Sequence, residues 1–212
     1  MQTLEQLIAR ARAYRADKFP EQQPHYQRLV SEGQSPKILM IACSDSRVDP
    51  TIIFGAEPGE IFLVRNVASL VPPFQPDTAC HGTSAALEFG VTNLGVEHVI
   101  VLGHGYCGGV AALLAGADKD RTSSDFIGPW LSSVAAVRDR LLSEHPDLPQ
   151  EEAERQLEFA TVRQSVENLR SFPWIAERVE KGTLALHGWH VDIAKGALRD
   201  VGDPASPRLI SG

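Results

Sequence analysis

The chain has 212 residues, 43% of them hydrophobic, with a formal net charge of −7 and a pI near 5.5. This acidic balance, without a long basic run, argues against a nucleic-acid partner, because such contacts are built from clustered Lys and Arg. The apolar runs are far shorter than the roughly 20 residues that a membrane span needs. We therefore expect no nucleic-acid partner and no membrane insertion.

The N-terminal segment shows apolar residues at helical spacing, with Leu4, Leu7 and Ile8 on one face. It predicts helices over residues 3–19 and 21–32, interrupted near Pro20. Arginines in this segment would also fit an organelle transit peptide, but Glu5 and the lack of a Ser-rich tract favour an ordinary surface helix. We expect a helical arm over residues 1–32 of one domain that spans residues 1–212.

The rest of the chain alternates short apolar runs with helical composition, which predicts an α/β fold. Unbroken apolar runs are typical of strands buried on both faces of a parallel sheet, and they occur at residues 37–43, 61–64 and 98–103. Helices are predicted at residues 82–94, 109–116, 125–142 and 151–171. A last strand over residues 183–193 is expected at the edge of the sheet. The predicted fold is a mostly parallel central β-sheet flanked by helices, with a C-terminal edge strand.

The three cysteines are odd in number and irregularly spaced, so they do not describe a disulfide framework. We expect reduced thiols and a cytoplasmic location. Each cysteine is then a candidate ligand, nucleophile or core residue.

The turn at residues 103–109 reads Gly-His-Gly-Tyr-Cys-Gly-Gly and fits two kinds of site. Its glycines satisfy the dinucleotide pattern G-x-G-x-x-G, which also needs an acid about 20 residues on, at the end of the next strand. Asp120 and Asp125 lie at about that distance but follow polar, turn-like residues. A dinucleotide site is therefore the weaker interpretation.

The other interpretation is a metal site. Cys43 ends the first predicted strand, His104 ends the third, and Cys107 begins the helix that follows. The carboxyl ends of parallel strands face one crevice, so these side chains can converge. Two thiolates and one imidazole form a zinc-binding set with a fourth position open, which is the mark of a catalytic zinc.

The segments around these residues resemble the β-class carbonic anhydrases. The likeness rests on motifs in the order found in that family: GQSP (33–36), ACSDSRV (42–48), PGEIFLVRNVASLVPP (58–73), HVIVLGHGYCGG (98–109), DFI (125–127) and LALHGW (184–189). Gln34 is present, and Met40 stands where one branch of the family has Trp, so the sequence is more similar to the plant-type branch.

The resemblance implies that Cys43, His104 and Cys107 bind Zn²⁺, with the fourth position taken by water or, in a closed state, by Asp45. It implies reversible hydration of carbon dioxide to bicarbonate and a proton, through attack of zinc-bound hydroxide on carbon. Asp45 and Arg47 are the implied catalytic residues. Arg47 can hold Asp45 off the metal through a bidentate pair, which leaves the carboxylate free to accept a hydrogen bond from the hydroxide.

The resemblance also implies an apolar substrate pocket, as carbon dioxide requires. Its implied residues are Gln34, from a neighbouring subunit, with Phe62, Val67, Phe89 and Gly108. The chain is therefore expected to form a homodimer or a higher even-numbered homo-oligomer. Two other functions stay open: hydrolysis of carbon disulfide or carbonyl sulfide on the same scaffold, and a non-catalytic zinc or thiol redox protein.

Overall fold

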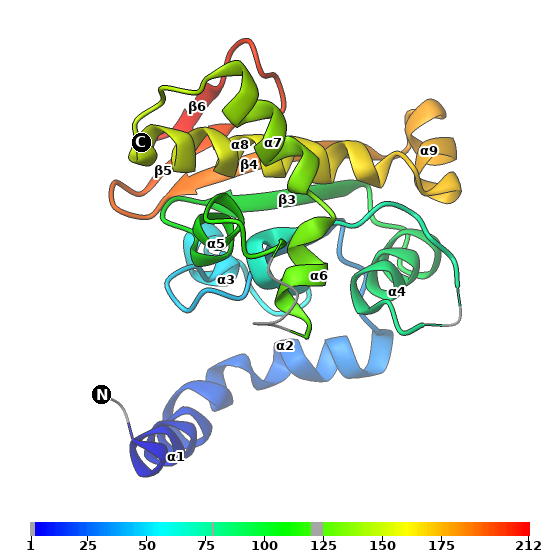
Figure 1. Ribbon diagram of the computed structural model, residues 1–212. Helices are drawn as coiled ribbons and strands as arrows, with labels where there is room; N and C mark the ends of the chain where they lie inside the picture. Colours follow the sequence, from blue (N-terminus) through cyan, green and yellow to red (C-terminus); the bar gives the residue numbers. More distant parts are fainter. Residues whose placement is uncertain (1–2, 78, 120–124) are drawn as a thin grey trace. The chain divides into compact units, whose positions relative to one another are not determined.

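The computed structural model describes residues 3–77, 79–119 and 125–212 and divides into two compact units, residues 1–35 and 36–212 (Figure 1). The predicted extent of a single domain, with its arm over residues 1–32, stays a prediction. The two units are described in turn.

The first unit is helical, as predicted, but without the break expected near Pro20. Helix α1 (Leu4–Ala13) passes through a π-helical turn (Tyr14–Lys18) directly into α2 (Phe19–Glu32). Pro20 lies in the first turn of α2, where a missing N–H breaks no hydrogen bond, so the helical path continues through it.

The second unit is built on one six-stranded sheet with the order β2-β1-β3-β4-β5-β6. The first four strands pair in parallel and the last two in antiparallel fashion. Their bounds are β1 Ile38–Cys43, β2 Ile61–Asn66, β3 His98–His104, β4 Ala185–Asp192, β5 Ala197–Asp200 and β6 Arg208–Ser211. The predicted α/β class with a mostly parallel sheet is confirmed.

The strand predicted over residues 183–193 exists as β4, but its expected place at the sheet edge is wrong. It lies between β3 and β5, and the C-terminal edge strand is β6. Strands β5 and β6 are four residues each, and β6 is exposed along its whole length. Such short segments carry no apolar run that the sequence could reveal.

Helices cover the sheet and connect its strands. Their bounds are α3 Pro50–Phe54, α4 Gly82–Glu88, α5 Gly108–Leu114, α6 Ile127–Ser132, α7 Ala135–Glu144, α8 Gln150–Leu169 and α9 Pro173–Glu180, with a 3-10 turn at Val67–Ser69 and a π-helical turn at Phe89–Asn93. The single helix predicted over residues 125–142 is two helices, because Val134 leaves the helical conformation between α6 and α7. Across the described residues, no helix is both long and apolar enough to span a bilayer.

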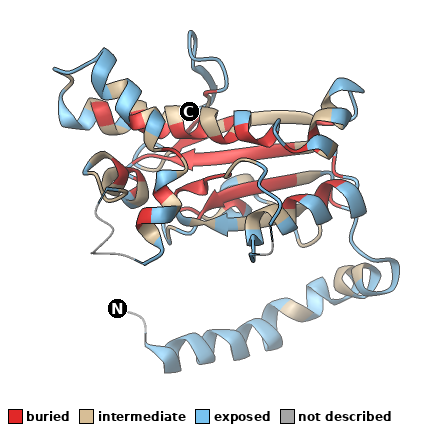
Figure 2. Cartoon of the chain, turned by 45° about the vertical axis from the view of Figure 1, so that its right-hand side comes forward, coloured by how far each residue is buried: buried red, intermediate tan, exposed pale blue. Residues whose placement is uncertain are grey.

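The core lies on both faces of the sheet, and the strands are its most buried part (Figure 2). On one face, alternate residues of β1 and β3, such as Leu39 and Val99, pack against α4, α8 and α9. On the other face, Met40 and Ile100 pack with Phe54 of α3. A third cluster surrounds the carboxyl ends of β1 and β3 and contains Cys43.

The close approach of α8 to the sheet depends on Gly103 in β3, because a Cβ at this position would overlap the side chain of Val162. We expect Gly103→Ala to destabilise the protein by about 1–3 kcal/mol through overpacking, measured by thermal unfolding. Gly82→Ala is the matched control, since a Cβ there meets no atom within 4 Å. In the double variant Gly103→Ala/Val162→Ala, the smaller side chain at 162 makes room for the new Cβ, so part of the lost stability should be recovered. No recovery would contradict the explanation.

Candidate metal centre

Three side chains from distant parts of the chain meet at the carboxyl edge of the parallel sheet. Cys43 is the last residue of β1, and His104 is the last residue of the neighbouring parallel strand β3. Cys107 is the N-cap residue of α5, three residues later. The convergence expected from the sequence is therefore observed.

The geometry of this group fits a metal ion. The three ligand atoms lie within 4.8 Å of one another, and the two sulfurs are 4.0 Å apart. Two thiolates on one tetrahedral zinc would be separated by about 3.8 Å, given Zn–S bonds of about 2.3 Å. All three residues are buried, so the donor atoms face one another away from solvent.

The imidazole of His104 presents its free nitrogen to the sulfurs. Its Nδ1 lies 2.9 Å from the carbonyl oxygen of Gly105, which places the ring proton on that nitrogen. The other nitrogen, Nε2, is buried and has no hydrogen-bond partner among the described residues. A buried acceptor without a partner is costly, and a bound cation would satisfy it.

The two thiols act as a coupled pair. The hydrogen bond to Cys107 lowers the pKa of Cys43 to about 4 against the effect of burial, and the nearby His104 acts in the same direction. The same hydrogen bond, together with burial, raises the pKa of Cys107. The first thiolate forms readily, but a second, 4.0 Å away, forms only if a cation lies between them.

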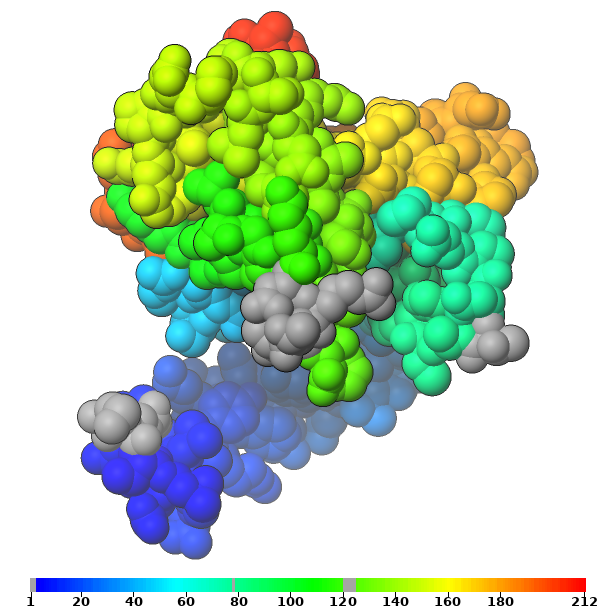
Figure 3. Space-filling model, viewed as in Figure 1, coloured from blue at the N-terminus to red at the C-terminus, as the bar shows by residue number. Residues whose placement is uncertain are grey.

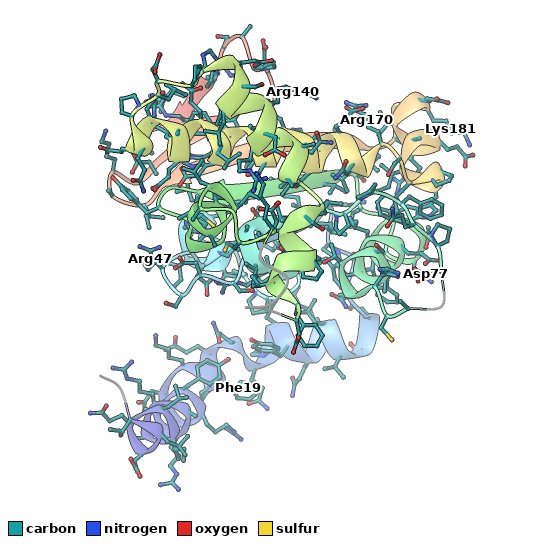
Figure 4. All side chains as sticks on the ribbon, in the orientation of Figure 1. Phe19, Arg47, Asp77, Arg140, Arg170 and Lys181 are labelled. Atoms are coloured by element: carbon teal, nitrogen blue, oxygen red, sulfur yellow. The ribbon has the colours of Figure 1, made fainter. Side chains whose placement is uncertain are left out.

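Asp45 and Arg47 form the bidentate pair that the sequence predicted. Arg47 donates from Nε to Oδ1 of Asp45 at 3.0 Å and from Nη2 to Oδ2 at 2.7 Å. These side-chain hydrogen bonds, helped by the Arg47 backbone N–H, hold the pKa of Asp45 well below its usual range. The carboxylate is thus ionised, and its Oδ2 lies 4.0 Å from His104 Nε2. Figure 4 labels Arg47, which lies at the left of that view.

The backbone around the group is strained. Among the described residues, the three non-glycine positions with positive φ are Ala68, Ser69 and Tyr106, and they lie in the two loops that flank the cysteines. Tyr106 directs its carbonyl oxygen to Arg47, which donates to it at 2.8 Å. Strain of this kind is concentrated at functional sites, where surrounding contacts enforce it.

The comparisons with known proteins agree with this geometry. A family model for carbonic anhydrase matches residues 38–198. Beta carbonic anhydrase 3 of Arabidopsis thaliana is 39% identical over 177 residues, which cover 83% of this chain and 68% of the relative. The chain belongs to the β-carbonic anhydrase family. The activity of this family is the reversible hydration of carbon dioxide.

Further members of the β-carbonic anhydrase family share its length and fold to different extents. The chain spans 57% of the chloroplastic beta carbonic anhydrase 5 of Arabidopsis thaliana, at 39% identity over 83% of this chain. The solved β-carbonic anhydrase CcaA is 31% identical with a TM-score of 0.87, covering 93% of this chain and 86% of that one. The tetrameric β-carbonic anhydrases of Sordaria macrospora are 31% identical with a TM-score of 0.79, covering 93% of this chain and 95% of that one.

The alternative of a dinucleotide site in this carbonic anhydrase chain finds no structural support. After α5, no strand precedes α6 in the described residues, and the next strand along the chain is β4. Asp125 lies in a bend just before α6, and Asp120 falls outside the described residues. The second half of a dinucleotide site is therefore not formed here.

One buried contact to the metal group was missed from the sequence. Glu158 of α8 accepts a hydrogen bond from the Cys107 N–H at 3.2 Å, and its other oxygen lies 3.0 Å from Nε2 of His190 on β4. Both side chains are about 95% buried. In the sequence, Glu158 cannot be distinguished from the other glutamates of the same helix. Only the structure shows that it is buried among apolar neighbours.

The residues assigned to the substrate pocket lie in two places. Val67 lines a cavity of about 650 Å³ whose walls also include Asn66, the residue paired with Cys43, together with Phe126 and Trp130. Gly108 opens α5 beside the cysteines. Cys80 and His81 line the same cavity.

Phe62 and Phe89 lie away from the metal group of their own chain. Their rings contact each other at 5.8 Å between centroids, and Phe62 pairs with Leu39, four residues before Cys43. Four residues of strand correspond to about 13 Å. Gln34 belongs to the first unit. The roles of these three residues stay predictions.

We expect Cys107→Ser to abolish tight metal binding, because a neutral hydroxyl replaces one of two thiolates. The loss in metal affinity should exceed about 100-fold, the upper cost of changing groups that only support a ligand. Competition with a chelator measures it. Cys80→Ser is the matched control, since Cys80 is exposed and lies outside the metal group, and equal losses in both variants would rule out the assigned ligand set.

Glu158→Gln should weaken metal binding less, by about tenfold, because it disturbs the hydrogen bond that holds the Cys107 backbone but removes no donor atom. Chelator competition again gives the affinity. Glu167→Gln, at an exposed position of the same helix, should bind metal like the native protein. An unchanged affinity in Glu158→Gln would show that this contact does not support the ligand.

Proposed function

We propose that this protein catalyses the reversible hydration of carbon dioxide to bicarbonate and a proton, with Zn²⁺ bound by Cys43, His104 and Cys107. The observation that carries the proposal is the buried Cys-His-Cys group beside a carboxylate held by arginine. Thiolate and imidazole donors in a four-coordinate arrangement suit Zn²⁺ better than Mg²⁺ or Ca²⁺, which prefer oxygen. When bound, zinc lowers the pKa of a water ligand and so supplies a nucleophile near neutral pH.

Asp45 orients the attacking water. Its pKa is depressed, so it is an acceptor at neutral pH, and Oδ2 faces the metal group at 4.0 Å from His104 Nε2. A hydrogen bond to this carboxylate turns a lone pair of the water oxygen toward carbon dioxide. Arg47 keeps the carboxylate in place through two donors. If Arg47 released it, Asp45 could become the fourth metal ligand and close the site.

The substrate is received by an apolar pocket completed by a second copy of the chain. Val67 and Asn66 line the apolar cavity, and Gly108 begins α5 directly after Cys107. Phe62 and Phe89 are too far along the sheet to reach the metal of their own chain, and Phe89 is 45% exposed, so they would serve a neighbouring copy.

The assembly is therefore a homodimer or a higher even-numbered oligomer, with Gln34 donated across the interface. Leu4, Leu7 and Ile8 are exposed within one chain, which favours burial against another copy. The tetrameric relatives from Sordaria macrospora support the same interpretation.

We place the protein in a reducing compartment, most simply the cytoplasm. All three cysteines are free thiols, and a disulfide between the two site cysteines would remove both thiolate donors. Two relatives from Arabidopsis thaliana are named as chloroplastic and as mitochondrial, so the compartment differs between members of the family.

Stopped-flow hydration of carbon dioxide tests the function directly. We expect Asp45→Asn to retain zinc yet to lose at least about 100-fold in kcat, because an amide cannot replace the ionised acceptor. Asp203→Asn, at an exposed turn, is the control and should match the native rate.

Three results would contradict the proposal. An Asp45→Asn variant as fast as the native protein would leave the acceptor role without support. Faster turnover of carbonyl sulfide or carbon disulfide than of carbon dioxide, in competition, would identify a hydrolase on the same scaffold. Zinc bound without any turnover would favour a non-catalytic zinc or thiol protein.

A further inference from the structure

A second cavity lies away from the metal centre, between α7, α8 and the loop after β5. Its volume is about 570 Å³, and its walls include Arg140 and His145 near the end of α7, Arg163 on α8, Arg170 just after α8, and Gly202. Helices α7 and α8 form the yellow-green surface of the face shown in Figure 3. No residue of the metal group lines this cavity.

The charged groups around this cavity are mostly basic. Three arginines and His145 line it, against two carboxylates, Glu144 and Glu167. Glu167 pairs with Arg170 at 3.5 Å, so one of these carboxylates is already engaged. A local excess of positive charge is notable in a chain whose net charge is −7, because it raises the local concentration of anions. Figure 4 labels Arg140 on α7 and Arg170 at the C-terminal end of α8.

Arg163 is the group that this cavity leaves without a counter-charge. It is half-buried, and among the described residues its side chain makes no ion pair and one long hydrogen bond, to the carbonyl oxygen of Val201 at 3.5 Å. Burial alone lowers its pKa, with no nearby carboxylate to oppose the effect. A guanidinium group has five N–H donors, so most of the donors of Arg163 have no acceptor among the described residues of the protein.

Arg138 shows how the same protein treats a buried arginine with a structural role. Its side chain is 2% exposed, and it bonds to the carboxylates of Asp118 and Asp139 and to the carbonyl oxygen of Leu113. These contacts fix α7 to the end of α5. Arg163 has no such set of acceptors, so structural anchoring does not explain its charge.

We propose that Arg163 binds the oxyanion group, phosphate or carboxylate, of a small molecule that occupies this cavity. The planar fork of a guanidinium matches both groups in a bidentate fashion. Arg140 adds positive charge to the same cavity, whereas Arg170 is paired with Glu167. The volume exceeds what a single oxyanion fills and is typical of sites for small organic ligands. The ligand is therefore an anionic metabolite bound by its charged end.

Isothermal titration calorimetry on the native protein tests this, with inorganic phosphate and citrate as separate probes at constant ionic strength. Saturable binding of phosphate identifies a phosphate-bearing ligand, and binding of citrate alone identifies a carboxylate. Arg163→Gln should weaken the binding at least tenfold, the effect of losing one charge-assisted hydrogen bond. Arg155→Gln, on the same helix but paired with Glu152, is the control for charge and should bind like the native protein.

The same comparison distinguishes binding in this cavity from binding at the metal group. Neither variant alters the metal group, so a probe bound there would bind both variants equally. Both variants should hydrate carbon dioxide at the native rate, which also shows that they fold. The proposal is overturned if the native protein binds neither probe saturably, or if Arg163→Gln binds as well as Arg155→Gln.

Thermal unfolding without ligand gives an independent test. Arg163→Met keeps the apolar stem and removes a half-buried, unpaired charge, so its Tm should equal or exceed that of the native protein. A lower Tm would mean that the contact with Val201 has a structural role and would contradict the proposal. Arg138→Met, which leaves two carboxylates without their partner, should lower the Tm and so shows that the measurement detects a structural arginine.

Discussion

The constraint on which this structure depends is the burial of two thiols and an imidazole within 4.8 Å of one another. Without a cation, one thiolate forms easily, a second is repelled by the first, and Nε2 of His104 has no hydrogen-bond partner among the described residues. A divalent cation resolves all of these costs at once. The surrounding features serve this arrangement, from the positive φ of Tyr106 to the lack of a side chain at Gly109, where a Cβ would lie 3.0 Å from Ala68.

The centre of the fold and the metal group could be predicted because both depend on local patterns. Strand β1 and the interior of β3 are apolar and buried on both faces, which an unbroken hydrophobic run reveals. Parallel pairing then brings their last residues, Cys43 and His104, to one edge whatever the distance along the chain. The pairing of Asp45 with Arg47 is also local, since a single residue separates them.

What the sequence could not reveal depends on how elements pack. Glu158 lies in a helix rich in glutamate, and only the docking of α8 on the sheet turns it toward Cys107 and His190. The order of β4, β5 and β6 depends on short antiparallel pairings that have no hydrophobic signature. Phe62 and Phe89 were assigned through the family resemblance, and their distance from Cys43 along the strands is a property of the sheet register.

The arginines of this chain differ in whether their guanidinium groups are paired with acceptors, and the paired and unpaired ones have different roles. Arg47 is matched by both oxygens of Asp45, Arg65 by the carbonyl oxygens of Cys43, Asp45 and Val48, and Arg138 by two carboxylates. Each holds a loop or a helix in place. Leaving a half-buried charge or a buried nitrogen without a partner costs free energy, and a fold keeps such a group only where something else satisfies it. His104 Nε2 is such a group at the metal centre, and by the same physical argument Arg163 is its counterpart between α7 and α8.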